Sequence, residues 1–482
     1  MGNQSTGGVN SSIEFELNGF ISQIELESII SYGMSAGADL VEVFLEKTDS
    51  ISCLAEQEAI SSVNPSFSRG AGIRVFKGIK DGFYSTNVIS FSGLKTALDY
   101  ALGMLGLKSS SSIQPTSFEG LQCLKDYSLD KIKDLNRLPN LEDVSDKILK
   151  GTDLLNKYGN HLTTRKGSYS RVKQEVIIAA SDGTHVKDIR LHQSMGLSVL
   201  ASHKEHRSSI GRRYGSSESP DALKDWDIAQ SAESICESVK AMLHADYVTA
   251  GTKPVILANR FGGVIFHEAC GHLLETTQIE RGTSPFSDKL NSKIANEAVT
   301  AIDEGFTDQA FGSLSVDDEG MEPQKTLLIE NGVLKNFLSD RGGQIRTGHK
   351  RTGSGRRQSH TFAAASRMRN TFIAAGNYEP KELIETVDDG IYCKSMGGGS
   401  VGATGQFNFS VEEGYLIKNG KLTTPVKGAT LIGEAKEILP KISMCANDLE
   451  LAAGYCGSVS GSVNVTVGQP HIKVDSITIG GR

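Results

Sequence analysis

The sequence lacks the excess of basic residues with which proteins bind nucleic acids. Its 57 aspartates and glutamates outnumber its 50 lysines and arginines, which gives a formal net charge of −7 and a pI near 5.9. Phosphate backbones are bound mainly through clustered positive charge. We therefore expect no nucleic-acid partner.

Long hydrophobic runs are also missing. A helix that crosses a bilayer needs about 18 or more apolar residues in succession, and no such stretch occurs, so no membrane partner is expected. The N-terminus carries neither the basic start nor the apolar centre of a secretory signal. Gly2 and Thr6 fit the short myristoylation pattern, but the pattern often matches by chance, and a flexible polar tail is the favoured interpretation.

Cysteine is sparse, and its number is odd. An odd, scattered set gives no basis for a disulfide framework, so a reducing, cytoplasmic location is favoured. Such cysteines are usually buried core residues, although one or two can serve as metal ligands. The seven are Cys53, Cys123, Cys236, Cys270, Cys393, Cys445 and Cys456.

The length exceeds what one hydrophobic core usually supports. A chain of 482 residues, 38% apolar and 22% charged, is expected to form two or three globular domains. We predict an α+β fold with an N-terminal α+β region at 1–120, a middle α+β region at 121–248 and a C-terminal domain at 249–482. The first two regions are expected to form a mixed α/β half. The third is expected to be mainly antiparallel sheet and to carry a metal-binding helix.

Local patterns support this division. Ser22 and Glu25 have capping-box spacing, which predicts a helix start. Residues 40–45 predict a strand, and apolar residues between 228 and 242 recur at helical spacing. Three dipeptides between strand-like segments predict tight hairpin turns: Asp182-Gly183, Asn331-Gly332 and Asn419-Gly420.

One segment of the C-terminal region combines a helical pattern with metal-binding side chains. Residues 263–275 contain the motif His267-Glu268-x-x-x-His272. Neutral imidazole is a good zinc ligand, and a catalytic zinc site takes three protein ligands and one water molecule. A carboxylate beside the first histidine can take a proton from that water and pass it to a leaving amine. Spacing alone leaves open that the two histidines are ordinary buried or surface residues.

The spacing of the two histidines constrains the backbone between them. Positions five apart lie ~140° apart around a regular α-helix, whereas positions four apart lie within ~40°. His267 and His272 therefore cannot reach one ion from an undistorted helix. We predict a widened turn, as in a π-bulge, or a broken turn at Ala269 to Gly271, where glycine tolerates the distortion.

A third ligand has to come from elsewhere in the chain. Cys456 is the first candidate, because a thiolate suits zinc and its glycine neighbours predict a tight turn that can approach an ion. Cys445 is a weaker candidate with core packing as the alternative. Cys270, between the two histidines, is expected to point away from the ion. Spacing alone does not decide among them.

Together these residues and several further stretches resemble the TldD/PmbA peptidases, on the TldD side. The likeness spans nearly the whole chain and is densest after residue 250. The stretches that carry it are His267–His272, Arg281–Ser284, Asp317–Gly320, Leu328–Leu334, Gly353–Arg356, Gly397–Gly399, Pro425–Gly433, Val467–Pro470 and Arg69–Arg74.

The resemblance implies a ligand set and a mode of action. Family members bind zinc (Zn2+) through both motif histidines and a distant cysteine, which falls on Cys456, and the family glutamate falls on Glu268. It also implies pairing with a PmbA/TldE-like subunit that lacks the motif, or a homodimer. Substrates are expected to be short or unfolded peptides that enter an enclosed cavity and are held by main-chain contacts. Cys270 departs from the small or aliphatic residue expected at its position and leaves a redox sensitivity open.

We therefore expect a zinc-dependent peptidase in which Glu268 is the general base on zinc-bound water, with His267, His272 and Cys456 as metal ligands. One alternative is a non-catalytic, PmbA/TldE-like peptide-binding subunit. Another is a structural zinc site with a fourth protein ligand such as Cys445.

Two further polar clusters have possible roles near the site. Arg356, Arg357 and His360 can orient a peptide carbonyl or stabilise an oxyanion, but an exposed basic loop is the favoured interpretation. The acidic run Asp317, Asp318 and Glu319 can support a turn or a ligand by hydrogen bonding, but a solvated acidic loop is favoured there.

Overall fold

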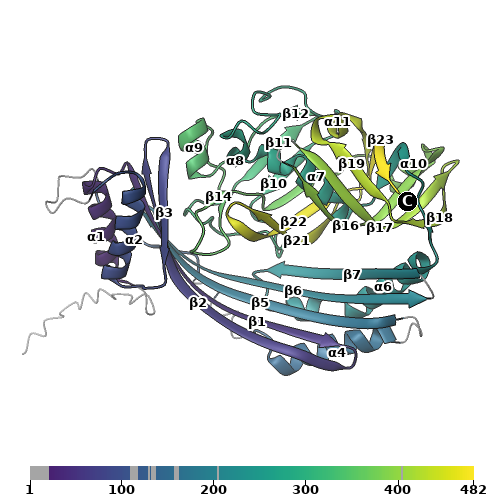
Figure 1. Cartoon of the computed structure of the whole chain (residues 1–482), viewed down its shortest axis with the longest axis horizontal. Coiled ribbons are helices and arrows are strands. Elements are labelled where there is room, and N and C mark those ends of the chain that lie inside the picture. The colour runs from purple at the N-terminus through teal and green to yellow at the C-terminus, as the bar shows by residue number, and fades with distance from the viewer. Residues whose placement is uncertain are drawn as a thin grey trace, which may run out of the picture.

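A large curved sheet and a C-terminal body above it make up the molecule (Figure 1). The structure is a computed structural model that describes residues 21–108, 118–128, 131, 137–156, 162–203, 206–402 and 405–481. The acylation pattern at Gly2 and Thr6 lies outside these residues. Helices and extensive, mainly antiparallel strands occur together, and the predicted α+β class is confirmed.

The curved sheet contains strands from both of the first two predicted regions. Its order is β3-β2-β1-β5-β6-β4, with β7 also beside β6, and the neighbours are antiparallel except for β4 and β6. The strands are β1 (Leu40–Glu56), β2 (Ala59–Lys77), β3 (Lys80–Thr86), β4 (Lys125–Asp126), β5 (Leu162–Ala180), β6 (His185–His203) and β7 (His206–Ser217). The helices beside them are α1 (Gln23–Ser35), α2 (Phe91–Met104), α4 (Leu141–Asn156), α5 (Ala222–Asp225) and α6 (Ile228–Leu243).

Strand β1 shows how the sequence assigns the two faces of this sheet. Successive side chains of a strand point to opposite faces. In residues 41–46 the odd-numbered apolar side chains enter a core with α1 and α2. Phe44 instead packs with Val316 of the C-terminal body, so Glu42 and Glu46 share the face that meets that body. Two carboxylates are thereby placed against the other half of the molecule.

The predicted helices begin and pack as their patterns indicate. Ser22 and Glu25 form the capping box at the start of α1. The apolar stripe of α6 is buried together with α4 and the neighbouring strands. Within the described residues, no helix is long and apolar enough to cross a bilayer.

The C-terminal body contains two main sheets. A six-stranded sheet has the order β12-β11-β10-β15-β22-β21 and an eight-stranded sheet the order β16-β9-β23-β19-β17-β18-β8, with β20 beside β23. The first comprises β10 (Ala301–Glu304), β11 (Lys325–Glu330), β12 (Val333–Leu334), β15 (Asn370–Ile373), β21 (Glu450–Ser458) and β22 (Gly461–Gln469). The second comprises β8 (Asp246–Tyr247), β9 (Gly251–Leu257), β16 (Asp389–Val401), β17 (Gln406–Lys418), β18 (Lys421–Lys427), β19 (Thr430–Glu434), β20 (Ile442–Cys445) and β23 (Ile472–Gly480).

Short helical elements link and cover these sheets, and β13 (Gly355–Arg356) pairs with β14 (Ala365–Ser366). They are η1 (Arg260–Gly263), α7 (Val264–Ala269), η2 (Gly271–Leu274), α8 (Thr276–Ile279), α9 (Arg341–Thr347), α10 (Pro380–Glu385), α11 (Ala435–Ile438) and η3 (Leu439–Lys441). Helix α7 contacts β15 and β22 of one sheet and β16 and β17 of the other. It therefore lies inside the main hydrophobic core, where its position is fixed from both sides.

The predicted hairpin turns are present. Asn331 and Gly332 have φ angles of 48° and 82°, and Asn419 and Gly420 have 48° and 71°. Two successive positive φ angles are the signature of the type I′ turn. Gly183, with φ of 93°, serves the hairpin between β5 and β6.

Candidate metal centre

The helix that carries the two motif histidines breaks between them. Helix α7 ends at Ala269, Cys270 has φ of −127° and ψ of −50°, and the chain resumes as the 3-10 helix η2 at Gly271. The interruption falls where the spacing predicted one and takes the form of a broken turn. It brings the rings of His267 and His272 to 5.1 Å between their centroids, almost perpendicular to each other at 84°.

Gly271 is required at this break by close packing. A Cβ atom at this position would lie 2.1 Å from the Sδ atom of Met368, a side chain that is fully buried. Cores this dense do not accommodate an added methyl group without rearrangement. The glycine therefore allows the turn after α7 to sit directly on Met368.

Cys456 reaches the same place from a strand. It lies in β21 opposite Val463 of β22, and both side chains are buried. The predicted tight turn at Cys456 is wrong, because the strand continues to Ser458 and the hairpin turns afterwards, at Val459 and Ser460. The two glycines beside the cysteine form part of the β-ladder, and they do not mark its end.

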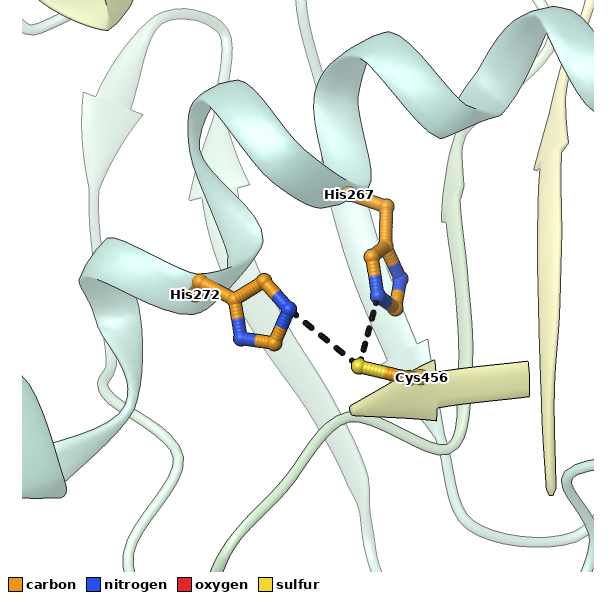
Figure 2. A group of neighbouring side chains, drawn as sticks. All are labelled: His267, His272 and Cys456. Carbon is orange, nitrogen blue, oxygen red and sulfur yellow. Dashed lines mark hydrogen bonds between the residues drawn. The ribbon is translucent and has the colours of Figure 1, made fainter. Parts of the chain in front are cut away.

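The two imidazoles and the thiol converge on one point (Figure 2). The Nε2 atom of His267 lies 3.1 Å from the Sγ atom of Cys456, and the Nε2 atom of His272 lies 3.2 Å from it. Bonds of ~2.0–2.1 Å to imidazole and ~2.3 Å to thiolate around tetrahedral zinc place such nitrogen and sulfur atoms roughly 3.5 Å apart. A small outward movement of the side chains therefore admits the ion, and the donor set fits zinc.

The surroundings of Cys456 favour the form of sulfur that binds metals. Burial alone raises the pKa of the Cys456 thiol, but the adjacent His267 and His272 imidazoles lower this pKa well below its usual range. The thiolate is the metal-binding form of cysteine. The site is thus electrostatically suited to a thiolate ligand.

Two buried residues support the convergent side chains, and both were missed in the sequence. Glu275 is fully buried, and its Oε2 atom lies 3.1 Å from the Nδ1 atom of His272. Arg367, also fully buried, donates from Nη2 to the backbone carbonyl of Cys456 at 2.5 Å and from Nη1 to the hairpin carbonyl of Gly461 at 2.8 Å. A carboxylate three residues after a histidine ligand is a detectable signal. Arg367 lies far away in the sequence and gave no such signal.

Glu268 lies at the edge of the convergent group. Its Oε2 atom is 3.6 Å from the Nε2 atom of His272, the nitrogen that faces the thiol. The side chain is 22% exposed, whereas His267 and Cys456 are almost fully buried. The carboxylate is therefore next to the candidate metal position and still open to solvent.

The other cysteines considered from the sequence lie apart from this group. In the described part of the chain, the cluster of ligand atoms that can share one metal ion comes from His267, His272 and Cys456. No fourth histidine, cysteine or carboxylate joins it. Cys445 is buried in the main core, and burial raises the pKa of its thiol to about 12. Cys270 packs in the same core. These positions do not support a site closed by four protein ligands.

The two polar clusters are buried, so the prediction of exposed, solvated loops is wrong for both. The Nη2 atom of Arg357 lies 2.6 Å from Oε1 of Glu42, and Nδ1 of His360 lies 2.8 Å from Oε2 of Glu46. Arg357 and His360 are buried because β1 presents these carboxylates to the C-terminal body. In the acidic run, Asp318 is buried against Arg190 of β6. The buried members are Arg356, Arg357, His360, Asp317, Asp318 and Glu319.

Comparison with known protein families covers most of the chain. Residues 250–481 match the PmbA/TldA metallopeptidase C-terminal domain. Residues 126–243 match the central domain of the same family, and residues 41–104 match its domain 1.

Individual relatives agree with these matches. The chain is 34% identical over 454 residues to a protein named Metalloprotease TldD homolog from Haemophilus influenzae, covering 92% of this chain and 93% of that protein. It is 28% identical over 417 residues to the Zinc metalloprotease TldD homolog of Saccharolobus solfataricus, covering 86% and 90% of the two chains. The crystal structure of TldE from Thermococcus kodakarensis shares the fold, with a TM-score of 0.73, 20% identity and coverage of 95% and 100%. The chain therefore belongs to the PmbA/TldA metallopeptidase family and is one of its TldD-like members.

Proposed function

We propose that this chain is a zinc-dependent peptidase that hydrolyses peptide bonds in short or unfolded peptides. The observation that carries the proposal is the convergence of the His267, His272 and Cys456 donor atoms beside the Glu268 carboxylate. The names of the relatives, which include metalloprotease and zinc metalloprotease, support the same activity.

Three side chains would hold the metal, and one coordination position would remain for water. When bound there, zinc supplies a Lewis acid that lowers the pKa of a coordinated water molecule to about 7 and polarises a carbonyl group. His267 and Cys456 would hold the ion from α7 and β21, and Glu275 would keep His272 oriented through its Nδ1 atom. The burial of these side chains keeps competing water away from the ligand atoms.

Glu268 is the proposed general base. Its carboxylate takes the proton of the attacking water and delivers it to the departing amine, so that one side chain serves both halves of the reaction. The partial exposure of Glu268 suits this role, because the carboxylate has to meet both the water and the substrate.

The strand that carries Cys456 supports main-chain recognition of the peptide. Among the described residues, β21 pairs with β22 on one side and has no strand on the other. An edge strand presents unpaired N–H and C=O groups, to which an extended peptide can hydrogen-bond irrespective of its side chains. We include in the proposal a TldE-like partner subunit or a second copy of this chain, because a TldE structure shares the fold.

Metal analysis and peptide cleavage test the proposal together. The purified chain is assayed for bound zinc and for cleavage of unstructured peptides, alone and with a TldE-like partner, with and without a chelator. Glu268→Gln should keep the metal and lower kcat by about 10²–10⁴-fold. Full activity of that variant would falsify the role of Glu268.

The same measurements separate the alternatives. A chain that binds peptides but contains no metal and cleaves nothing, even with a partner, is the non-catalytic subunit. A cobalt-substituted sample whose spectrum indicates four protein ligands identifies a structural site.

A further inference from the structure

A cavity of about 240 Å³ lies between the curved sheet and the C-terminal body. Its wall combines residues of β1, β5 and β6 with residues of the loop around β13 and of β22. Val463 belongs to the wall and is the direct strand partner of Cys456. Facing residues on paired strands lie about 5 Å apart, so the cavity approaches the candidate metal centre.

The carboxylates in this wall, those of Asp318 and Glu46, already accept hydrogen bonds from neighbouring residues. Oδ1 of Asp318 accepts from Arg190 at 2.5 Å, and Oδ2 accepts from the backbone N–H of Arg357 at 2.7 Å. Oε2 of Glu46 accepts from the backbone N–H of His360 at 2.6 Å and lies 2.8 Å from its ring. Oε1 of Glu46 accepts from Gln174 at 2.8 Å and from Thr48 at 2.9 Å. Within the described part of the chain, every oxygen of these two carboxylates therefore already accepts a hydrogen bond.

Arg356 is the exception among the arginines of this region. The residue lines the cavity and is 4% exposed, and its Nη1 atom donates to the backbone carbonyl of Met368 at 2.8 Å. Among the described residues, no carboxylate lies within ion-pairing distance of it, whereas Arg190 pairs with Asp318 and Arg357 with Glu42. A buried charge without a partner is unfavourable. The Arg356 guanidinium is therefore suited to pair with an anionic group of a bound ligand.

The neighbouring groups reinforce this positive potential. Burial lowers the pKa of Arg356 to about 10, although Asp318 opposes the shift, and the nearby arginines Arg367 and Arg190 lower it further. Burial together with Arg190 and Arg356 lowers the pKa of His192, another wall residue, to about 3. Burial is the largest cause of this shift, and the contribution of the two arginines indicates positive potential at the His192 ring.

We propose that this cavity binds a carboxylate group of the peptide substrate, with Arg356 as the anchoring residue. The peptide nature of the ligand rests on the proposed function, whereas the carboxylate site stands on its own geometry. A planar guanidinium matches a carboxylate with two parallel hydrogen bonds. The cavity is smaller than the ~300–1,000 Å³ pockets that enclose drug-sized ligands, so it accepts one end or one side chain of a peptide.

Equilibrium binding tests the site without any need for turnover. Fluorescently labelled peptides are titrated against the full-length chain in the presence of a chelator, and binding is followed by fluorescence anisotropy. Three peptides of one neutral sequence are compared: a free C-terminal acid, the C-terminal amide, and the amide with one internal aspartate. The acid or the aspartate peptide should bind about tenfold or more tightly than the amide, and which of them does so identifies the source of the carboxylate.

Substitutions of Arg356 test whether this residue causes the preference for the peptide that carries a carboxylate. Arg356→Met should lower the affinity for the preferred peptide to that of the amide, and Arg356→Lys should retain part of the preference. The matched control is Arg171→Met, which also removes a guanidinium whose Nη1 atom donates to a backbone carbonyl, that of Pro139, but lies outside the cavity wall. It should leave the preference unchanged.

The results distinguish this proposal from the proposed function. Equal affinity of the unmodified chain for all three peptides overturns the carboxylate site even if peptides are cleaved. A preference that survives in a folded Arg356→Met variant also overturns it. A clear preference in a chain that cleaves no peptide supports the carboxylate site while the peptidase proposal fails.

Discussion

Replacing Glu275 by glutamine should weaken zinc binding without unfolding the protein. The Glu275 carboxylate is fully buried, lies 3.1 Å from Nδ1 of His272 and accepts from the backbone N–H of Met368 at 3.3 Å. Glutamine keeps the shape and one acceptor oxygen but loses the charge that strengthens the bond to His272. Removing such a partner of a histidine ligand typically weakens metal binding by 10- to 100-fold.

We expect the lower end of that range, about tenfold, because the glutamine oxygen can still accept a hydrogen bond from the Nδ1–H group of His272. A tenfold change corresponds to ~1.4 kcal/mol. Either substitution removes the oxygen that accepts from the Met368 N–H. Glu275→Ala should reach about 100-fold, because it also leaves Nδ1 of His272 without an acceptor and opens a cavity in the core. Glutamine is therefore the cleaner substitution.

The assay is competition between the full-length chain and a chromogenic zinc chelator of known affinity at fixed pH. Glu280→Gln is the matched control, since it removes a carboxylate five residues further on that pairs with Arg346 at 3.0 Å and does not contact the histidines. Circular dichroism checks that both variants are folded. Zinc affinity equal to that of the unmodified chain in a folded Glu275→Gln variant would refute the supporting role of Glu275.

Three further results are expected. Cys456→Ser should reduce the zinc content of the purified chain to near zero, because a neutral hydroxyl replaces the thiolate; stoichiometric zinc would contradict the ligand set. Gly271→Ala should destabilise the chain by about 1–3 kcal/mol through overpacking against Met368, measured by chemical denaturation, and an unchanged midpoint would show that this contact relaxes freely. Asp182→Asn should flatten the pH dependence of thermal stability in acid. Burial raises the pKa of Asp182, but Arg341 outweighs it and holds this pKa at about 2, so its stabilisation is present above pH ~4 and lost as the pH falls toward 2. A variant with the same acid profile as the parent chain would contradict that account.

Local sequence patterns were sufficient for much of the secondary structure. The capping box at Ser22, the apolar stripe of α6 and the Asn-Gly hairpins depend on neighbouring residues alone, and each is present. The predicted strand at 40–45 is the start of β1, which continues to Glu56. Its polar second half gave no apolar alternation, and it is held in the sheet by pairing with β2 and β5.

The site residues were predictable to different extents. The five-residue histidine spacing required an interruption of the helix, and one occurs at Cys270. The surroundings of Cys456 were misjudged, since its glycines form part of a ladder with β22, a pairing that spacing does not reveal. Glu275 was within reach of a helical-spacing argument, whereas Arg367 was not.

By itself, the sequence determined which side chains are chemically able to hold and use a metal, because ligand type and helical periodicity are properties of adjacent residues. Only the tertiary structure decided which distant groups meet them and which charges are buried. Arg356 shows the difference: its residue type and neighbours predicted an exposed basic loop. The packing of the C-terminal body on the curved sheet instead buries it, with no carboxylate of the described segments within ion-pairing distance. Burial depends on how two separate surfaces meet, and no local pattern in either segment encodes that.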